Sequence, residues 1–217
     1  DGKVSLSDVT YLVDYLLGKV DPYEYVDLGL PSGTLWATCN VGAESPEEYG
    51  DYFAWGETEK KSNYDWSTYA HCNGSSSTLT KYCQDSSYGY NGFTDTLTEL
   101  EPEDDAAYVN WGSEWRMPTK TQQDELRTEC TWTWTTQNGV NGRLVTGPNG
   151  NSIFLPAAGC RYESSLYRAG SDGYYWSRTL GTSDPNNAYF LYFYSGNVYW
   201  GYDYRYGGRS VRPVRNQ

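Results

Sequence analysis

The chain has 217 residues and a formal net charge of −12, and 17% of its residues are aromatic. Residues 1–160 carry 24 acidic against 9 basic side chains, whereas residues 161–217 carry 4 against 7. This balance excludes nucleic acid as a general partner, because no basic field attracts phosphates. No apolar run reaches the length of a membrane span, so we expect no membrane insertion. The length suits one domain with a small appendage.

The first 21 residues have the spacing of the end of a calcium loop followed by a helix. Asp1, Lys3 (through its backbone carbonyl) and Asp8 stand at ligand positions of an EF-hand-like loop, and the apolar positions that follow predict a helix ending at Gly18. The segment resembles the second half of a dockerin-type repeat, found in secreted bacterial proteins. Its first two ligands are missing, so we expect weak or no calcium binding, with a helix N-cap as the alternative role of Asp8. Calcium is expected only with an intact upstream loop, and no other cofactor is expected.

Residues 22–217 form the second predicted unit. Residues 25–42 predict a β-hairpin around a Pro-Ser-Gly turn, and residues 44–50 predict a short helix with Pro46 at its first position. Residues 53–56 predict a strand. The polar stretch 58–95 has few aliphatic residues and predicts a long irregular excursion.

Five cysteines cannot all pair within the chain. Cys72 and Cys83 flank a Ser/Thr-rich loop, and two alternatives stay open for them, one disulfide in an oxidising compartment or two free thiols. Cys39, Cys130 and Cys160 stand beside apolar or small residues, which favours buried thiols.

The middle of the chain predicts two helices and three strands. Residues 100–111 predict a short helix whose acids Glu103, Asp104 and Asp105 lie in the first turn, where helix capping is favoured over a metal cluster. Thr119 is the expected N-cap of a helix over Lys120–Glu129. Strands are expected at residues 132–136, 143–146 and 152–155, divided by Asn-Gly pairs that are typical of hairpin turns.

From Arg161 onward the chain holds eleven of its 23 tyrosines. Tyr, Trp and small polar residues are what binding surfaces use, since the rings offer rigid contact area at low entropic cost; the alternative is an aromatic-rich sheet whose rings cover a core. Alternation along residues 188–194 sends Leu191 and Phe193 to the core and their neighbours outward. We expect a ligand surface of Tyr162, Tyr167, Arg168, Asp172, Tyr174, Arg178, Tyr192, Tyr194, Tyr199, Trp200, Tyr202, Asp203, Tyr204 and Tyr206. Arg212 and Arg215 are expected to hold carbonyls or carboxylates near the closing strand.

Four motifs in order carry a family resemblance: YVDLGLPSGTLWATCNVGA, EPEDDAAYVNWG with WRMPT, NGNSIFLPAAGCR, and YWS with GRSVRPVR. Together they resemble the Fibrobacter succinogenes major paralogous domain, a C-type-lectin-like fold of the formylglycine-generating-enzyme type. The resemblance implies an α+β fold with paired N- and C-terminal strands, two main helices, short antiparallel strands and a loop-rich C-terminal ligand face. It also implies a secreted or cell-surface location, with a signal or lipid anchor upstream. Some proteins of this fold are variable targets of diversity-generating retroelements, and the C-terminal third is similar to such a region.

Two chemical alternatives lack their motifs. The catalytic relative of this fold oxidises a peptide cysteine with a C-terminal cysteine pair, whereas this chain has no cysteine after Cys160, so no such activity is expected. His71 is the only histidine, and its neighbour Cys72 is not a dyad partner by adjacency alone. A calcium-dependent lectin needs a Glu-Pro-Asn or Gln-Pro-Asp tripeptide, which is absent.

The favoured hypothesis is a non-catalytic binding module, an adhesin or variable receptor for an unknown protein or glycan. The alternative is a structural or interaction domain of a secreted or surface assembly, in which the tyrosines pack against neighbouring domains or subunits.

Overall fold

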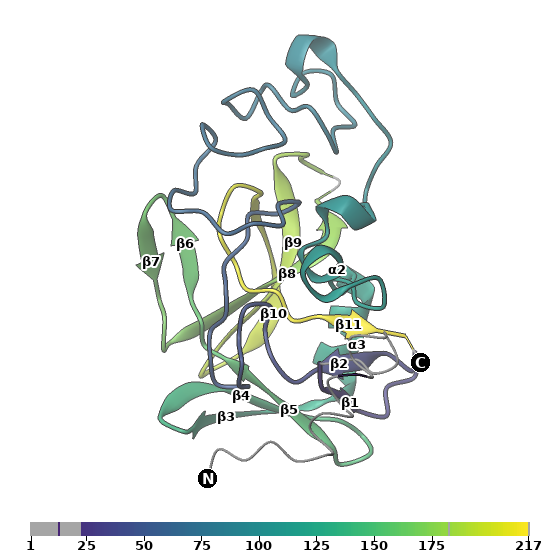
Figure 1. Ribbon diagram of the computed structural model, residues 1–217, viewed down its shortest axis with the longest axis vertical. Helices are drawn as coiled ribbons and strands as arrows, with labels where there is room; N and C mark the ends of the chain where they lie inside the picture. The colour runs from purple at the N-terminus through teal and green to yellow at the C-terminus, as the bar shows by residue number, and fades with distance from the viewer. Residues whose placement is uncertain (1–12, 14–22, 182, 217) are drawn as a thin grey trace.

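The computed structural model describes residue 13 and residues 23–181 and 183–216, and it has an α+β fold rich in short antiparallel strands (Figure 1). The predicted calcium-loop ligands Asp1, Lys3 and Asp8 lie outside these described residues. Within the described part of the chain, no helix is both long enough and apolar enough to cross a membrane.

The elements of the described residues include two α-helices and two short 3-10 helices. Their bounds are β1 Tyr25–Asp27, β2 Leu35–Ala37, η1 Tyr90–Gly92, η2 Pro102–Asp104, α2 Ala106–Trp111, α3 Lys120–Glu129, β3 Thr131–Gln137, β4 Val140–Thr146, β5 Ser152–Pro156, β6 Cys160–Tyr162, β7 Ser165–Tyr167, β8 Asp172–Leu180, β9 Asn187–Tyr194, β10 Val198–Tyr204 and β11 Val214–Arg215.

The three-stranded sheet β10-β9-β8 lies at the centre and separates two hydrophobic cores. Because neighbouring residues of a strand point to opposite faces, Trp176 and Phe190 enter one core while Tyr175, Leu191 and Phe193 enter the other. The predicted inward positions Leu191 and Phe193 are confirmed, with 1% and 0% exposure. The sheet is therefore covered over much of both faces, while Tyr194 of β9 and Tyr199, Tyr202 and Tyr204 of β10 are exposed.

The described residues also form a two-stranded sheet of β6 and β7 and two further three-stranded sheets. In one, β2 pairs with both β1 and the C-terminal strand β11, so the predicted 25–42 hairpin and the expected pairing of N- and C-terminal strands are observed. In the other, β3, β4 and β5 form an antiparallel sheet at the bottom of Figure 1. Helix α3 begins at the predicted N-cap, where the Thr119 hydroxyl accepts the Gln122 N–H at 3.0 Å. The helix buries Leu126.

The predicted excursion over residues 58–95 is confirmed as irregular chain at the top of Figure 1, with η1 as its only regular element among the described residues. Its two cysteines are free thiols. The Cys72 Sγ donates to the Trp66 carbonyl at 3.2 Å, and the Cys83 Sγ donates to the Asp85 carbonyl at 3.1 Å. Of the other three cysteines, Cys160 is buried, while Cys39 and Cys130 are partly exposed.

Two predicted elements are wrong. Residues 44–50 form turns instead of a helix, because the chain leaves helical geometry after one turn and the Tyr49 carbonyl accepts the Asn40 side-chain amide at 2.9 Å. The predicted strand at residues 53–56 is reduced to a single bridge between Phe53 and Arg209. Both stretches are shaped by hydrogen bonds to distant residues that no local pattern contains.

Candidate ligand-binding surface

The aromatic residues of the C-terminal strands are divided between the two faces of the central sheet. Register places Tyr174, Tyr192 and Tyr199 directly opposite one another across β8, β9 and β10, so the three rings share one face. Trp200 and Tyr202 take the alternate positions of β10 and lie on the other face. The rings of the predicted surface are therefore divided between the two faces of the sheet, and Trp200 and Tyr202 do not share a face with Tyr174, Tyr192 and Tyr199.

The shared face carries a cluster that we call the tyrosine array, made of Tyr174, Tyr192, Tyr194 and Tyr199. The Tyr192 ring is its hub, with centroids 4.8 Å from Tyr174, 4.8 Å from Tyr199 and 6.0 Å from Tyr194. Tyr194 and Tyr199 are 37% and 43% exposed. Rings at these separations attract one another and hold one another's orientation, so the array presents a preorganised aromatic surface.

A buried carboxylate fixes the hub of the array. Asp172 is 3% exposed, and it accepts hydrogen bonds from the Tyr192 hydroxyl and from Ser171. The guanidinium of Arg168 lies 3.7 Å from the same carboxylate. Burial, and after it the hydrogen bond to Asp172, raises the pKa of Tyr192 above its ordinary value, so the hydroxyl stays a donor at neutral pH. Asp172 was predicted to face a ligand, but its burial gives it the role of positioning Tyr192.

A second group of rings lies between the β6-β7 hairpin and the excursion, and we call it the loop-side cluster. It consists of Tyr162, Tyr167, Tyr204, Tyr206 and Trp66. Tyr162 contacts Tyr167 and Tyr206 at centroid distances of 6.2 and 6.1 Å, and Tyr206 stacks on Tyr204 at 5.5 Å and contacts Trp66 at 5.1 Å. Sequence reasoning missed Trp66, whose only signal is a tryptophan within a polar loop.

Arg209 contacts one ring of each group, since its guanidinium lies 5.9 Å from the Tyr174 ring centroid and 5.8 Å from that of Tyr162. Its guanidinium is fully buried and lies 4.1 Å from the ring centroids of both Trp176 and Phe190. One nitrogen, Nη2, donates to the Tyr162 hydroxyl and to the Asp203 carboxylate, both at 2.8 Å. Tyr162 in turn donates to Asp203, so this predicted pair is held by one buried cation.

Part of the positive charge of the C-terminal third is internal. Arg205, Arg209 and Arg212 are at most 1% exposed. As predicted, Arg212 donates to backbone carbonyls, those of Ala37 and Thr38 at 3.1 and 2.8 Å, and Arg215 lies 3.5 Å from a Glu114 carboxylate oxygen. Three of the seven arginines from Arg161 onward therefore have their charge inside the protein.

Several residues of the predicted ligand surface belong to neither aromatic group, and some of them contact other parts of the protein. Arg178 is partly buried and pairs with Glu99 at 3.0 Å. The Trp200 indole N–H donates to Asp124 of α3 at 2.9 Å, and the Lys120 ammonium lies 4.5 Å from the Trp200 ring centroid. Trp200 therefore ties β10 to α3. Tyr167 and Arg168 are exposed, as expected of surface residues.

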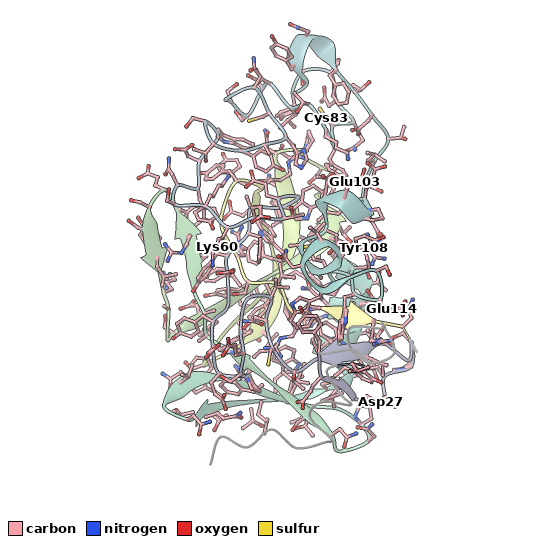
Figure 2. The ribbon with its side chains drawn as sticks, viewed as in Figure 1. Asp27, Lys60, Cys83, Glu103, Tyr108 and Glu114 are labelled. Carbon is pink, nitrogen blue, oxygen red and sulfur yellow. The ribbon has the colours of Figure 1, made fainter. Side chains whose placement is uncertain are left out.

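A pocket of about 400 Å³ is lined in part by His71. Lys60 of the excursion and Glu103 of η2, both labelled in Figure 2, lie on its wall. The His71 Nε2 is 2.7 Å from the Gly56 carbonyl, while the Cys72 thiol donates elsewhere, so these neighbours form no nucleophile–base pair. Burial lowers the pKa of His71, which makes the neutral ring the main form at pH 7.

The acidic residues considered as a metal cluster have structural partners instead. Asp105 caps α2 by accepting the N–H groups of Ala107 and Tyr108, and it pairs with Arg116 at 2.8 Å. Asp104 accepts from Lys81 at 2.7 Å. No group of three or more histidine, cysteine, aspartate or glutamate side chains in the described residues has the geometry to hold a metal ion.

Part of the chain matches a known family model. Residues 117–214 match the family model of a domain of unknown function (DUF8237). No curated protein and no solved structure matches the chain. The matched residues begin just before α3, end at the first residue of β11 and include all of β8, β9 and β10, so the match covers the strands that carry the tyrosine array.

Proposed function

We propose that the chain is a non-catalytic binding module, an adhesin or variable receptor that uses the tyrosine array and the loop-side cluster to recognise a protein or glycan. The proposal includes a C-type-lectin-like fold and a secreted or cell-surface location, both supported by the four sequence motifs. The alternative is a structural domain whose tyrosines pack against a neighbouring subunit.

The observation that carries the proposal is the exposed, preorganised tyrosine array. Three tyrosines stand in register across three strands, and a buried carboxylate holds the central hydroxyl. A scattered exposed ring needs no explanation, whereas contiguous exposed rings mark interaction sites. Rigid tyrosines bind with a small loss of side-chain entropy, and their hydroxyls add hydrogen bonds, so the array suits sugar rings or a protein surface.

The chemistry of the remaining polar groups supports a binding role over catalysis. Cys160 is the last cysteine of the chain, so the cysteine pair of the formylglycine-generating enzymes has no counterpart here. The only histidine is bonded to a backbone carbonyl and is not placed beside a nucleophile. We therefore propose that recognition, without bond making, is the activity of this surface.

The test is a binding screen of the purified chain against glycan and cell-surface-protein arrays, beside the double variant Tyr194→Ala/Tyr199→Ala. Both rings are exposed, so their removal should leave the fold intact while lowering affinity for any array hit by at least about 10-fold. The matched control is Tyr90→Ala/Phe93→Ala, which removes two rings of similar exposure, 43% and 36%, from the region of η1.

A hit that the first variant loses and the control keeps would place recognition on the tyrosine array. A hit that both variants keep would move the site elsewhere. Circular dichroism and the solution mass of each variant are measured in the same buffer, so that a loss of binding is not confused with unfolding or with a change of assembly.

A further inference from the structure

The two edges of the central sheet differ in how their backbone groups are satisfied. Along the outer edge of β8, the Tyr174 carbonyl accepts from Ser210 N–H at 3.2 Å and Trp176 N–H donates back to the Ser210 carbonyl at 3.1 Å. Leu180 N–H donates to the Thr98 carbonyl at 2.9 Å. Loops therefore cover the β8 edge, and strand β10 forms the other edge.

The register of β10 shows which of its groups point outward. Tyr194 N–H donates to the Asn197 carbonyl at 3.1 Å, and Arg205 N–H donates to the Asn186 carbonyl at 2.9 Å. In an antiparallel ladder bonded positions alternate, so the odd-numbered residues of β10 bond to β9 and the even-numbered ones face outward. The outward residues are Val198, Trp200, Tyr202 and Tyr204.

Local side chains satisfy both ends of this edge and leave its centre open. Val198 N–H donates to the Asn197 side chain at 2.8 Å, and Tyr204 N–H donates to the Asp203 side chain at 2.7 Å. Between them, the backbone N–H and C=O groups of Trp200 and Tyr202 form no hydrogen bond with any described residue. Tyr202 is also the most exposed large hydrophobic residue described, at 63%.

The edge lacks the usual protection against strand pairing. Exposed edges are normally guarded by lysine, proline, a bulge or an inward charge. The β10 sequence, VYWGYDY, has no lysine or proline and pairs with β9 in unbroken register. Its one charged residue, Asp203, is engaged with Arg209 and Tyr162. An open, uncharged edge of this kind accepts another strand.

We propose that the occupant of this edge is β10 of a second copy of the chain, paired antiparallel about a two-fold axis at Gly201. This register sets Trp200 opposite Tyr202 of the second copy, so the open N–H and C=O groups of each satisfy those of the other. The two Gly201 residues meet at the axis, where neither carries a side chain. A Cβ there would lie 2.1 Å from the Phe190 ring, which explains why the centre of the strand is glycine.

The residues of β10 favour pairing between two copies of the strand. It places the Trp200 indole beside a tyrosine ring, and cross-strand aromatic pairs stabilise antiparallel sheets. The acidic side chains that give the chain its net charge of −12 come mainly from residues 1–160, outside β10. The resulting six-stranded sheet carries the two tyrosine arrays on one face, so a ligand with repeated epitopes is bound by both copies at once.

The test measures the mass of the chain by light scattering across a concentration series at moderate salt, beside Tyr202→Pro and Tyr202→Ala. Proline removes an N–H that faces away from β9, so it spares the β9 ladder. Because the two-fold axis repeats the loss, we expect Tyr202→Pro to raise the dimer dissociation constant by roughly 30-fold or more. Tyr202→Ala keeps the N–H and should raise the dissociation constant less.

Amide hydrogen exchange of the unaltered chain tests the same contact without a variant. The N–H groups of Trp200 and Tyr202 should exchange quickly in dilute solution and slowly at concentrations where the dimer forms, while the N–H of Gly201, bonded to β9, stays protected throughout. A chain that is monomeric at every concentration, or a dimer in which these two amides remain fast, would overturn the proposal. Neither result bears on ligand binding by the tyrosine array, which lies on the face of the sheet.

Discussion

The placement of Tyr192 depends on one buried residue. Asp172 begins β8 and receives the Tyr192 hydroxyl from the neighbouring strand, while its own neighbour Ser171 supplies a second donor. A buried carboxylate is stable only when such donors surround it. The same interaction therefore stabilises the fold and orients the proposed binding surface.

Substitution of Asp172 measures its contribution to the stability of the fold. We expect Asp172→Ala to lower the free energy of unfolding by about 2 to 3 kcal/mol, because it leaves the Tyr192 hydroxyl without its charged acceptor. Asp172→Asn keeps an acceptor oxygen and should cost roughly half as much. Urea denaturation measures both values. A cost below about 0.5 kcal/mol for Asp172→Ala would show that the carboxylate contributes little.

The alternation of side chains along a strand predicted correctly which face of the sheet the apolar residues of β9 occupy. It placed Leu191 and Phe193 inside, and it already separates Tyr199 from Trp200 and Tyr202, although composition led us to join them in one surface. The burial of Asp172 was not predictable, because its partner lies twenty residues ahead on another strand. The buried arginines were equally hidden, since a charge in the sequence gives no sign of a stacked, hydrogen-bonded site.

At the scale of elements, helix α3 depends on its N-terminal cap. The Thr119 hydroxyl accepts Gln122 N–H, and the Gln122 side chain accepts Thr119 N–H at 2.9 Å. We expect Thr119→Ala to lower the free energy of unfolding by about 1 kcal/mol, with no change in the urea m-value. Thr121→Ala is the matched control, because Thr121 is exposed in the same turn and should change stability by less than about 0.5 kcal/mol. Equal effects of both changes would contradict a capping role.

Elements defined by local chemistry were predicted, and elements defined by distant partners were not. The Thr-x-x-Gln cap of α3 and the Asn138-Gly139 turn between β3 and β4 are readable within a few residues. A second of the three Asn-Gly pairs expected to form turns, Asn141-Gly142, lies inside β4, so that expectation is wrong. Gly142 is needed there for close approach, since a Cβ would lie 2.4 Å from the Leu155 carbonyl. A glycine at a crowded strand position and a glycine in a turn look alike in a single sequence.

At the scale of the whole molecule, aromatic rings take the place of aliphatic core volume. Trp36, Trp55, Trp115 and Trp176 are all at most 1% exposed, and several tyrosines are buried with their hydroxyls on backbone carbonyls. Such a core tolerates neutral pH without cost, because a tyrosine is uncharged there. It becomes a source of instability only when the pH approaches the range in which phenols ionise.

Alkaline pH should therefore destabilise the fold, and substitution of Tyr175 should show how much this residue contributes to the loss of stability. Burial raises the pKa of Tyr175 to about 12, against about 10 in an unfolded chain. The stabilising contribution of Tyr175 is thus complete below pH 10 and is lost as the pH rises through 12, by about 2 to 3 kcal/mol. Tyr175→Phe removes this loss but also the hydrogen bond to the Pro156 carbonyl at 2.6 Å. Urea denaturation from pH 8 to 12 should show the variant less stable than the unaltered chain at pH 8 and closing that gap at higher pH, whereas parallel curves would mean that Tyr175 ionises alike in both states.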